Sequence, residues 1–168
     1  MRKPEIIMIC AVDSNMGIGK DNDMLFYISE DLKRFKQLTE GHSVVMGRKC
    51  WESLPKRPLP KRENIILTSN PNYQCEGGIL ANSMAQALTT IQKSDKVFII
   101  GGAQIYKLFM PYATKLLITE IDNNSKDADV FFPNIDKNAW ELVCKSEVFV
   151  DAKGLRFRYL EFTSQDTY

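Results

Sequence analysis

An acidic side chain stands at the start of an apolar helical pattern in the first third of the chain. Asp31, Phe35 and Leu38 are spaced i, i+4 and i+7, which places them on one face of a helix, with Leu32 beside them. A carboxylate on a core-facing stripe would be partly desolvated, and its pKa would rise. Such a group could bind an amidine-like cation or supply a proton.

The same carboxylate also has a purely structural interpretation. Ser29 is the predicted N-cap, so Glu30 and Asp31 would both lie in the first helical turn. Acidic residues at that place stabilise a helix by complementing its dipole. The pattern alone leaves the structural and the chemical interpretation open.

Two predicted strands end in glycine and lead into helices. Gly47 precedes Arg48 and Lys49, and the pair Gly101-Gly102 follows a second apolar run. Glycine at such a turn lets the backbone approach a ligand, and the N-terminus of the next helix offers free N–H groups to phosphate. Neither turn is a G-x-G-x-x-G motif, so together they only weakly indicate an extended phosphate-bearing ligand.

Basic residues concentrate in one part of the chain. The 168 residues carry a net charge of +1, but residues 33–62 hold nine basic and two acidic side chains. That segment therefore has a charge of +7, and the remainder has −6. The segment alternates strand and loop patterns and forms no continuous basic stripe, so a small polyanion fits it better than nucleic acid does.

Composition limits the remaining chemistry. His42 is the only histidine, which excludes a zinc site built from several histidines and restricts a Ser-His-Asp triad to this one residue. The four cysteines form no C-x-x-C pair, and we expect Cys10 and Cys144 to be small core residues. We find no signal-peptide pattern and no run near the ~20 apolar residues of a membrane span, so a cytoplasmic protein is expected.

Short apolar runs alternate with helical patterns along the whole chain. This order predicts one α/β domain over residues 1–168, with a largely parallel sheet, helices on both faces and an antiparallel C-terminal hairpin. The predicted strands are 6–12, 43–46, 64–68, 97–100, 115–121, 141–150 and 155–162, and the predicted helices are 30–40, 48–54, 83–92 and 103–109. Residues 13–28 and 55–62 are expected to be long loops, which are often functional.

Several motifs in a fixed order resemble the dihydrofolate reductase family over nearly the whole chain. They are Ala11-Val12-Asp13 with Gly17-Ile18-Gly19-Lys20, Glu30-Asp31-Leu32-Lys33-Arg34-Phe35-Lys36, residues 45–54 and 57–62, Ile100-Gly101-Gly102-Ala103-Gln104-Ile105-Tyr106, and Asp129-Val130-Phe131-Phe132-Pro133. The resemblance implies a mostly parallel eight-stranded central sheet, an antiparallel C-terminal hairpin, about four flanking helices and an adenosine-binding subdomain over residues 42–94. It also implies reduction of 7,8-dihydrofolate to tetrahydrofolate with NADPH.

On the substrate side, the resemblance implies a pocket around Asp31. This carboxylate would pair with the pterin 2-amino group and N3 and would promote protonation at N5, while Thr119 would orient it. Arg62 would bind the α-carboxylate of the substrate's glutamate, with Lys36 and Arg57 near that tail. The further implied substrate contacts are Ile7, Met8, Leu32, Phe35, Leu54, Ile100 and Tyr106.

On the cofactor side, the resemblance implies that NADPH binds across the two glycine turns. The implied contacts are Ile9, Ile18, Gly19, Lys20, Asn22, Met24, Gly47, Arg48, Lys49, Cys50, Leu67, Thr68, Ser69, Asn82, Ile100, Gly101, Gly102, Ala103, Gln104, Ile105 and Tyr106. Family members carry a cis peptide at the paired glycines, so we expect one at Gly101–Gly102. Residues 17–24 would form a mobile flap over the nicotinamide, and no metal is expected.

Phe26 stands where the family usually has tryptophan. Its ring has no N–H to hold a water near the pterin, so the resemblance groups Phe26 with Asp31 and Thr119 but implies an altered proton path. The expected partners are dihydrofolate and antifolate inhibitors, with no nucleic acid and no membrane, and the chain is expected to be a monomer. The alternatives are a related reductase acting on a pyrimidine or another pterin, a non-catalytic folate- or nucleotide-binding module, and a nucleic-acid binder that rests only on the basic segment.

Overall fold

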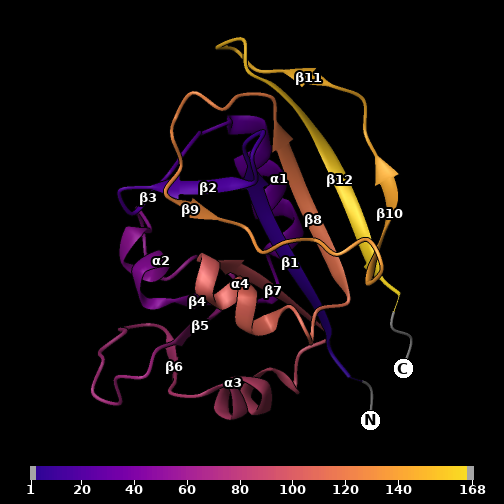
Figure 1. The fold of residues 1–168 in the computed structure, drawn as a ribbon. Helices are drawn as coiled ribbons and strands as arrows, with labels where there is room; N and C mark the ends of the chain where they lie inside the picture. Colours follow the sequence, from indigo (N-terminus) through magenta and orange to yellow (C-terminus); the bar gives the residue numbers. More distant parts are fainter. Residues whose placement is uncertain (1–2, 166–168) are drawn as a thin grey trace.

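A nine-stranded sheet runs through the centre of the molecule, with helices on both faces (Figure 1). The computed structural model describes residues 3–165. Eight strands follow one path, in the order β10 (Trp140–Lys145), β12 (Arg156–Ser164), β8 (Lys115–Ile121), β1 (Glu5–Val12), β7 (Lys96–Gly101), β4 (Ser43–Gly47), β5 (Glu63–Leu67) and β6 (Ile79–Ala81). The ninth strand, β11 (Phe149–Val150), pairs with β12.

The direction of these strands agrees with the sequence-based expectation. The six strands from β8 to β6 along the path pair in parallel, whereas β12 is antiparallel to both β8 and β10. The expected mostly parallel eight-stranded sheet with an antiparallel C-terminal end is therefore confirmed. The short strand β6 was not predicted, because three residues carry too little alternation to mark a strand, and the strand predicted over residues 141–150 is divided into β10 and β11.

Residues 13–28, expected to be irregular, contain two short strands. Here β2 (Gly17–Lys20) pairs with β3 (Asp23–Met24) and with β9 (Val130–Phe131) in a second antiparallel sheet. The segment is rich in glycine and aspartate, which are depleted in strands, so its composition concealed these pairings.

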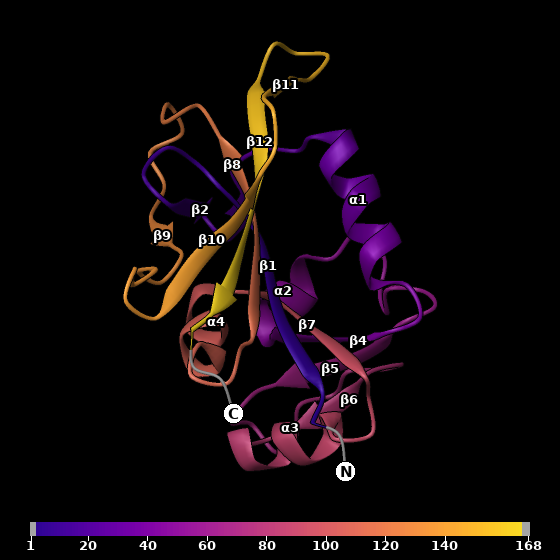
Figure 2. The same ribbon diagram turned by 90° about the vertical axis from the view of Figure 1, so that its right-hand side faces the viewer.

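The four helices divide between the two faces of the large sheet. α1 (Ser29–Thr39) and α2 (Arg48–Ser53) contribute Phe35 and Trp51 to one apolar cluster, and α3 (Met84–Ile91) and α4 (Ala103–Phe109) contribute Ile91 and Phe109 to the other. Figure 2 shows α1 and α4 on opposite sides of the sheet. None of the helices described within residues 3–165 is long and apolar enough to cross a membrane.

The start of α1 differs from the prediction. Ile28 occupies the N-cap position with no side-chain hydrogen bond, and Ser29 is the first helical residue rather than the cap. Its first-turn acids, Glu30 and Asp31, are placed as expected. In contrast, Ser83 caps α3 by accepting a hydrogen bond from the backbone N–H of Gln86 over 3.1 Å.

The central strand β1 supplies both apolar clusters because successive side chains of a strand point to opposite faces. Met8 and Val12 join the cluster beneath α3 and α4, and Ile7 and Ile9 join the cluster beneath α1. The prediction of two core cysteines was correct only in part. Cys10 is half-buried against the first cluster, but Cys144 is exposed, because β10 is an edge strand.

Candidate active site

A cavity of about 1030 Å³ opens where several parallel strands end. Its walls include the carboxyl-terminal parts of β1, β4, β5, β7 and β8, the first turns of α1 and α4, and the sheet made by β2. Open α/β sheets bind ligands beyond the carboxyl ends of their strands. The strand order therefore creates this cavity and brings residues far apart in the sequence to its walls.

Asp31 lies in this cavity and is held from the sheet. The Thr119 hydroxyl in β8 donates a hydrogen bond of 2.6 Å to Asp31 Oδ1, and Thr119 itself is buried. Burial raises the pKa of Asp31, while the Thr119 hydrogen bond and the charge of Arg34 oppose that rise. The chemical interpretation of this carboxylate thus has structural support, since it can exchange a proton nearer to neutral pH than an exposed aspartate.

Apolar side chains surround the carboxylate. Phe35, Leu54 and Ile100 pack against the cluster beneath α1 and line the cavity, and Phe26 closes it from the other side with 8% of its surface exposed. A flat slot with one ionisable group at its base suits a planar heterocycle with polar edges. Leu32 also lines the slot but remains 43% exposed.

The outer end of this slot is basic. Arg62 lines it, with Nη1 donating to Thr39 Oγ1 over 3.0 Å and Nε donating to the Pro60 carbonyl over 2.9 Å. These bonds orient the guanidinium and leave its other N–H groups for a carboxylate. Lys36 lies at the same end.

The glycine turns form the other half of the cavity. A peptide in the cis form joins Gly101 and Gly102, as expected, and Gly101 has a φ of +128°, a conformation that favours glycine. A Cβ atom on Gly102 would meet no atom within 4 Å, so it would project into open space at the cavity wall. Tyr106, in α4, donates from its buried hydroxyl to the Ile9 carbonyl over 2.7 Å and so fixes this corner.

The β2 strand forms the rim next to this corner. Asp13 is buried and accepts hydrogen bonds from the backbone N–H groups of Asn15 (2.8 Å) and Gly17 (2.6 Å). A Cβ atom on Gly17 would lie 2.4 Å from Ala128 Cβ, so only glycine fits there. This anchoring sets where Ile18 and Gly19 meet the cavity.

Most of the residues implied by the family resemblance line this one cavity. On the substrate side these are Phe26, Asp31, Leu32, Phe35, Lys36, Leu54, Arg62, Ile100, Tyr106 and Thr119. On the cofactor side they are Ile9, Ile18, Gly19, Asn22, Met24, Gly47, Arg48, Lys49, Cys50, Leu67, Thr68, Ser69, Asn82, Gly101, Gly102, Ala103, Gln104 and Ile105.

Four expected site residues lie outside the lining. Ile7 and Met8 are buried in the two clusters, and Met8 has no exposed surface. Lys20 is exposed at the end of β2, and the Arg57 guanidinium lies 5.7 Å from the centre of the Trp51 ring. Cys10, Tyr27 and Ile121 line the cavity although no motif contains them, and Asp13 and Leu59 line it from motifs that gave them no role.

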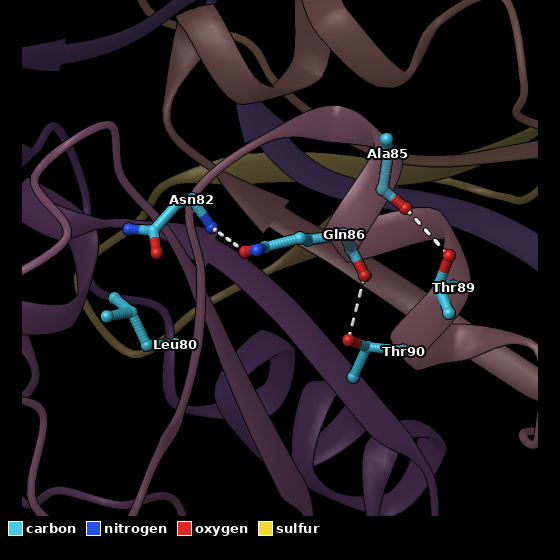
Figure 3. A pocket seen from close by; sticks show the side chains of 6 residues that line it. All are labelled: Leu80, Asn82, Ala85, Gln86, Thr89 and Thr90. Atoms are coloured by element: carbon cyan, nitrogen blue, oxygen red, sulfur yellow. Dashed lines mark hydrogen bonds between the residues drawn. The ribbon is translucent and has the colours of Figure 1, made fainter.

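A second hollow, of about 480 Å³, lies beside α3 (Figure 3). Its polar groups bond to one another: Thr89 and Thr90 donate to carbonyls of their own helix, and the Asn82 N–H donates to Gln86 Oε1 over 2.6 Å. This hollow holds no ionisable group and offers no chemistry. Across residues 3–165, no group of three or more His, Cys, Asp or Glu side chains is placed to hold a metal.

The parallel sheet and the cavity beyond its strand ends are typical of α/β nucleotide-binding proteins. The same cavity also holds one mostly desolvated carboxylate, Asp31. A family model described as dihydrofolate reductase matches residues 5–164, which is nearly the whole chain. The chain belongs to the dihydrofolate reductase family.

Individual relatives agree with this assignment. The dihydrofolate reductase of Neisseria meningitidis serogroup B is 42% identical over 158 residues, covering 94% of this chain and 97% of the relative. That of Bacillus subtilis is 40% identical over 149 residues, covering 89% of this chain and 88% of the relative. A solved structure of dihydrofolate reductase from Enterococcus faecalis, complexed with NADP(H) and RAB-propyl, has a TM-score of 0.88 and 35% identity, covering 96% and 97%.

Proposed function

We propose that this protein reduces 7,8-dihydrofolate to 5,6,7,8-tetrahydrofolate with NADPH. The observation that carries the assignment to this site is Asp31, a mostly desolvated carboxylate held by Thr119 inside the cavity. The ionised carboxylate can accept two parallel N–H bonds from the pterin 2-amino group and N3, as it would from a guanidinium. Its raised pKa also favours passing a proton toward N5 as that nitrogen gains electron density.

The residues at the glycine turns fit the cofactor. The open space at Gly102 and the close packing of Gly101 against Tyr106 leave the backbone accessible to a pyrophosphate. Arg48 and Lys49, at the start of α2, would hold the 2′-phosphate, and Ser69 lies near them at the cavity wall. NADPH supplies the hydride that reduces C6.

The other side chains position the substrate and exclude water. Phe35, Leu54 and Phe26 enclose the pterin ring, and Arg62 binds the α-carboxylate of the glutamate tail. Excluding water strengthens the pairing between the pterin and Asp31, because charges interact more strongly in a less polar medium. Ile18 and Gly19 would shield the nicotinamide from the rim.

A direct absorbance assay of NADPH oxidation tests the proposal. NADPH oxidation, followed at about 340 nm, should require added dihydrofolate and should be slower with NADH. A related reductase would oxidise NADPH with another pterin or a pyrimidine, and a binding module would bind dihydrofolate without oxidation. Either result would replace the proposed function.

We further propose that the chain acts as a monomer in the cytoplasm. All four of its cysteines are free, and unpaired thiols are typical of reducing compartments. Light scattering on the purified protein should give a mass close to 19.2 kDa. A value near twice that mass would show that the chain is a dimer.

A further inference from the structure

Arg34 lies behind the catalytic carboxylate rather than in the cavity. It follows Asp31 by three positions in α1, so the two side chains share one side of the helix. The guanidinium carbon of Arg34 lies 4.0 Å from the centre of the Tyr159 ring in β12. A cation at that distance from a ring centre is attracted by the negative face of the aromatic ring.

The ring of Tyr159 is itself fixed. Phe149 and Phe157 lie with their ring centres 5.8 Å from it. Its backbone N–H donates to Ser146 Oγ over 2.8 Å. Arg34 is therefore held by a rigid support and is not free to sample solvent at random.

Four residues lie next to one another at this place. Tyr159 is the direct cross-strand partner of Thr119, and opposite residues of an antiparallel pair point to the same face. Thr119 binds Asp31, and Arg34 lies one turn from Asp31. The Asp31 carboxylate is thus hydrogen-bonded to Thr119 on one side, and the Arg34 cation, held on the Tyr159 ring, acts on it through its charge.

One buried nitrogen of the half-buried Arg34 indicates that its charge has a use. Its Nη1 atom is buried and has no hydrogen-bond partner within residues 3–165. A buried N–H without a partner destabilises the fold, and an apolar side chain could cover Tyr159 without that cost. Packing alone therefore does not explain an arginine here.

The groups that face Asp31 come from four elements, α1, β8, β12 and β1. Burial raises the pKa of Asp31, and the Thr119 hydrogen bond and the charge of Arg34 oppose that rise. Burial also raises the pKa of Tyr159 and that of Cys10 in β1, and the negative charge of Asp31 adds to both shifts, as that of Glu30 does for Tyr159. On the opposite face, Glu120 and Arg158 neutralise each other over 2.6 Å.

We propose that Arg34 is a positioning residue of the reaction: held on the Tyr159 ring, its cation keeps Asp31 ionised and aimed at the pterin. This inference rests on the proposed function for its link to catalysis. The supporting charge comes from behind Asp31 instead of from the cavity side.

The test is a titration of the Asp31 carboxyl carbon by ¹³C NMR in the unliganded protein, with its signal assigned from its absence in Asp31→Asn. Arg34→Met should move the midpoint to higher pH. Arg34→Lys keeps the positive charge and should leave the midpoint close to the wild-type value. Lys33→Met is the matched control, because it removes the same charge from an adjacent exposed position of α1. It should leave the midpoint unchanged.

Catalysis should follow the titration. In Arg34→Met, the pH dependence of dihydrofolate reduction should move to higher pH, and kcat/KM at neutral pH should change about two- to fivefold. Tyr159→Leu, which removes the support of the cation, should shift the midpoint in the same direction, and Tyr159→Phe should not. These two variants keep the test valid if Arg34→Met fails to fold.

The outcomes separate the two proposals. Equal midpoints in Arg34→Met and Lys33→Met, or in Tyr159→Leu and Tyr159→Phe, would overturn the role of Arg34 even in an active enzyme. A wild-type protein that does not oxidise NADPH with dihydrofolate would overturn the proposed function. The NMR titration would still measure the coupling of Arg34 to Asp31.

Discussion

The hydroxyl of Thr119 donates to the Asp31 carboxylate over 2.6 Å, although the two residues are 88 positions apart in the chain. This bond joins the first turn of α1 to the middle of β8 and lies at the base of the cavity. It fixes one carboxylate oxygen and leaves the second one for a ligand. The position of this carboxylate therefore depends on the helix and on the sheet together.

Replacing Asp31 by asparagine should remove most activity. The amide cannot accept two N–H bonds or transfer the proton, so kcat/KM for dihydrofolate should fall by about 10²–10⁴ at neutral pH. Steady-state kinetics measure this change. Activity within a factor of two of the wild type would remove Asp31 from the mechanism.

The same substitution should stabilise the fold in a pH-dependent way. Because the pKa of Asp31 is raised in the folded state, folded protein binds the proton more tightly than unfolded protein does. The stability that this group contributes is present below about pH 4 and is lost as the pH rises through the folded-state pKa. The gain in Asp31→Asn should thus be largest at neutral pH and vanish in acid, as measured by urea unfolding.

Thr119→Val should weaken catalysis, although the valine side chain has nearly the same shape as that of threonine. The variant removes the hydrogen bond that lowers the pKa of Asp31, so the pH profile should move to higher pH, with kcat/KM about tenfold lower. Thr90→Val is the control, since it also removes a threonine hydroxyl bond, 2.8 Å long, but outside the cavity. Identical pH profiles for the two variants would contradict the orienting role of Thr119.

Arg62→Leu should raise KM for dihydrofolate about 10- to 100-fold, because a charge-assisted bond to the glutamate tail is lost. A pterin that lacks the glutamate should show no such change. Arg57→Leu removes an equal charge from a side chain that lies over Trp51, outside the cavity lining, and should have little effect. If Arg57→Leu raises KM as much as Arg62→Leu does, the assignment of the tail site is wrong.

Gly102→Ala should weaken NADPH binding by about tenfold without lowering the melting temperature. Its Cβ would occupy open space at the cavity wall and would meet no protein atom within 4 Å. Gly154→Ala should lower the melting temperature without weakening NADPH binding. Gly154 has a φ of +85°, which disfavours alanine, and it lies in the C-terminal hairpin loop, outside the cavity lining. Fluorescence titration with NADPH and thermal unfolding distinguish the two effects.

The cysteines should differ sharply in reactivity. Burial raises the pKa of Cys10 to about 12 and that of Cys50 to about 11, so both thiols should react slowly. Exposed Cys144 should supply a single fast equivalent with a disulfide reagent, and Cys144→Ser should abolish it. Labelling of Cys144 should leave activity intact, and a fast phase that survives in Cys144→Ser would contradict this assignment.

The sequence by itself determined most of the elements and the chemical type of the site. Apolar runs identified the parallel strands except β6, and the α4 helix was predicted over its observed residues, 103–109. The spacing of Asp31, Phe35 and Leu38 identified a carboxylate on an apolar helical face, because helical periodicity is a local property. The fixed order of motifs then indicated the family.

Only the tertiary structure decided which side chains meet. Strand order is a non-local property, so the sequence could not bring Thr119 to Asp31 without the family resemblance, nor could it place Tyr159 behind Thr119. Cys144 is exposed because β10 lies at the sheet edge. The apolar residues next to it in the sequence had suggested a buried position. No sequence pattern could place Arg34 over the Tyr159 ring, because that contact joins α1 to β12.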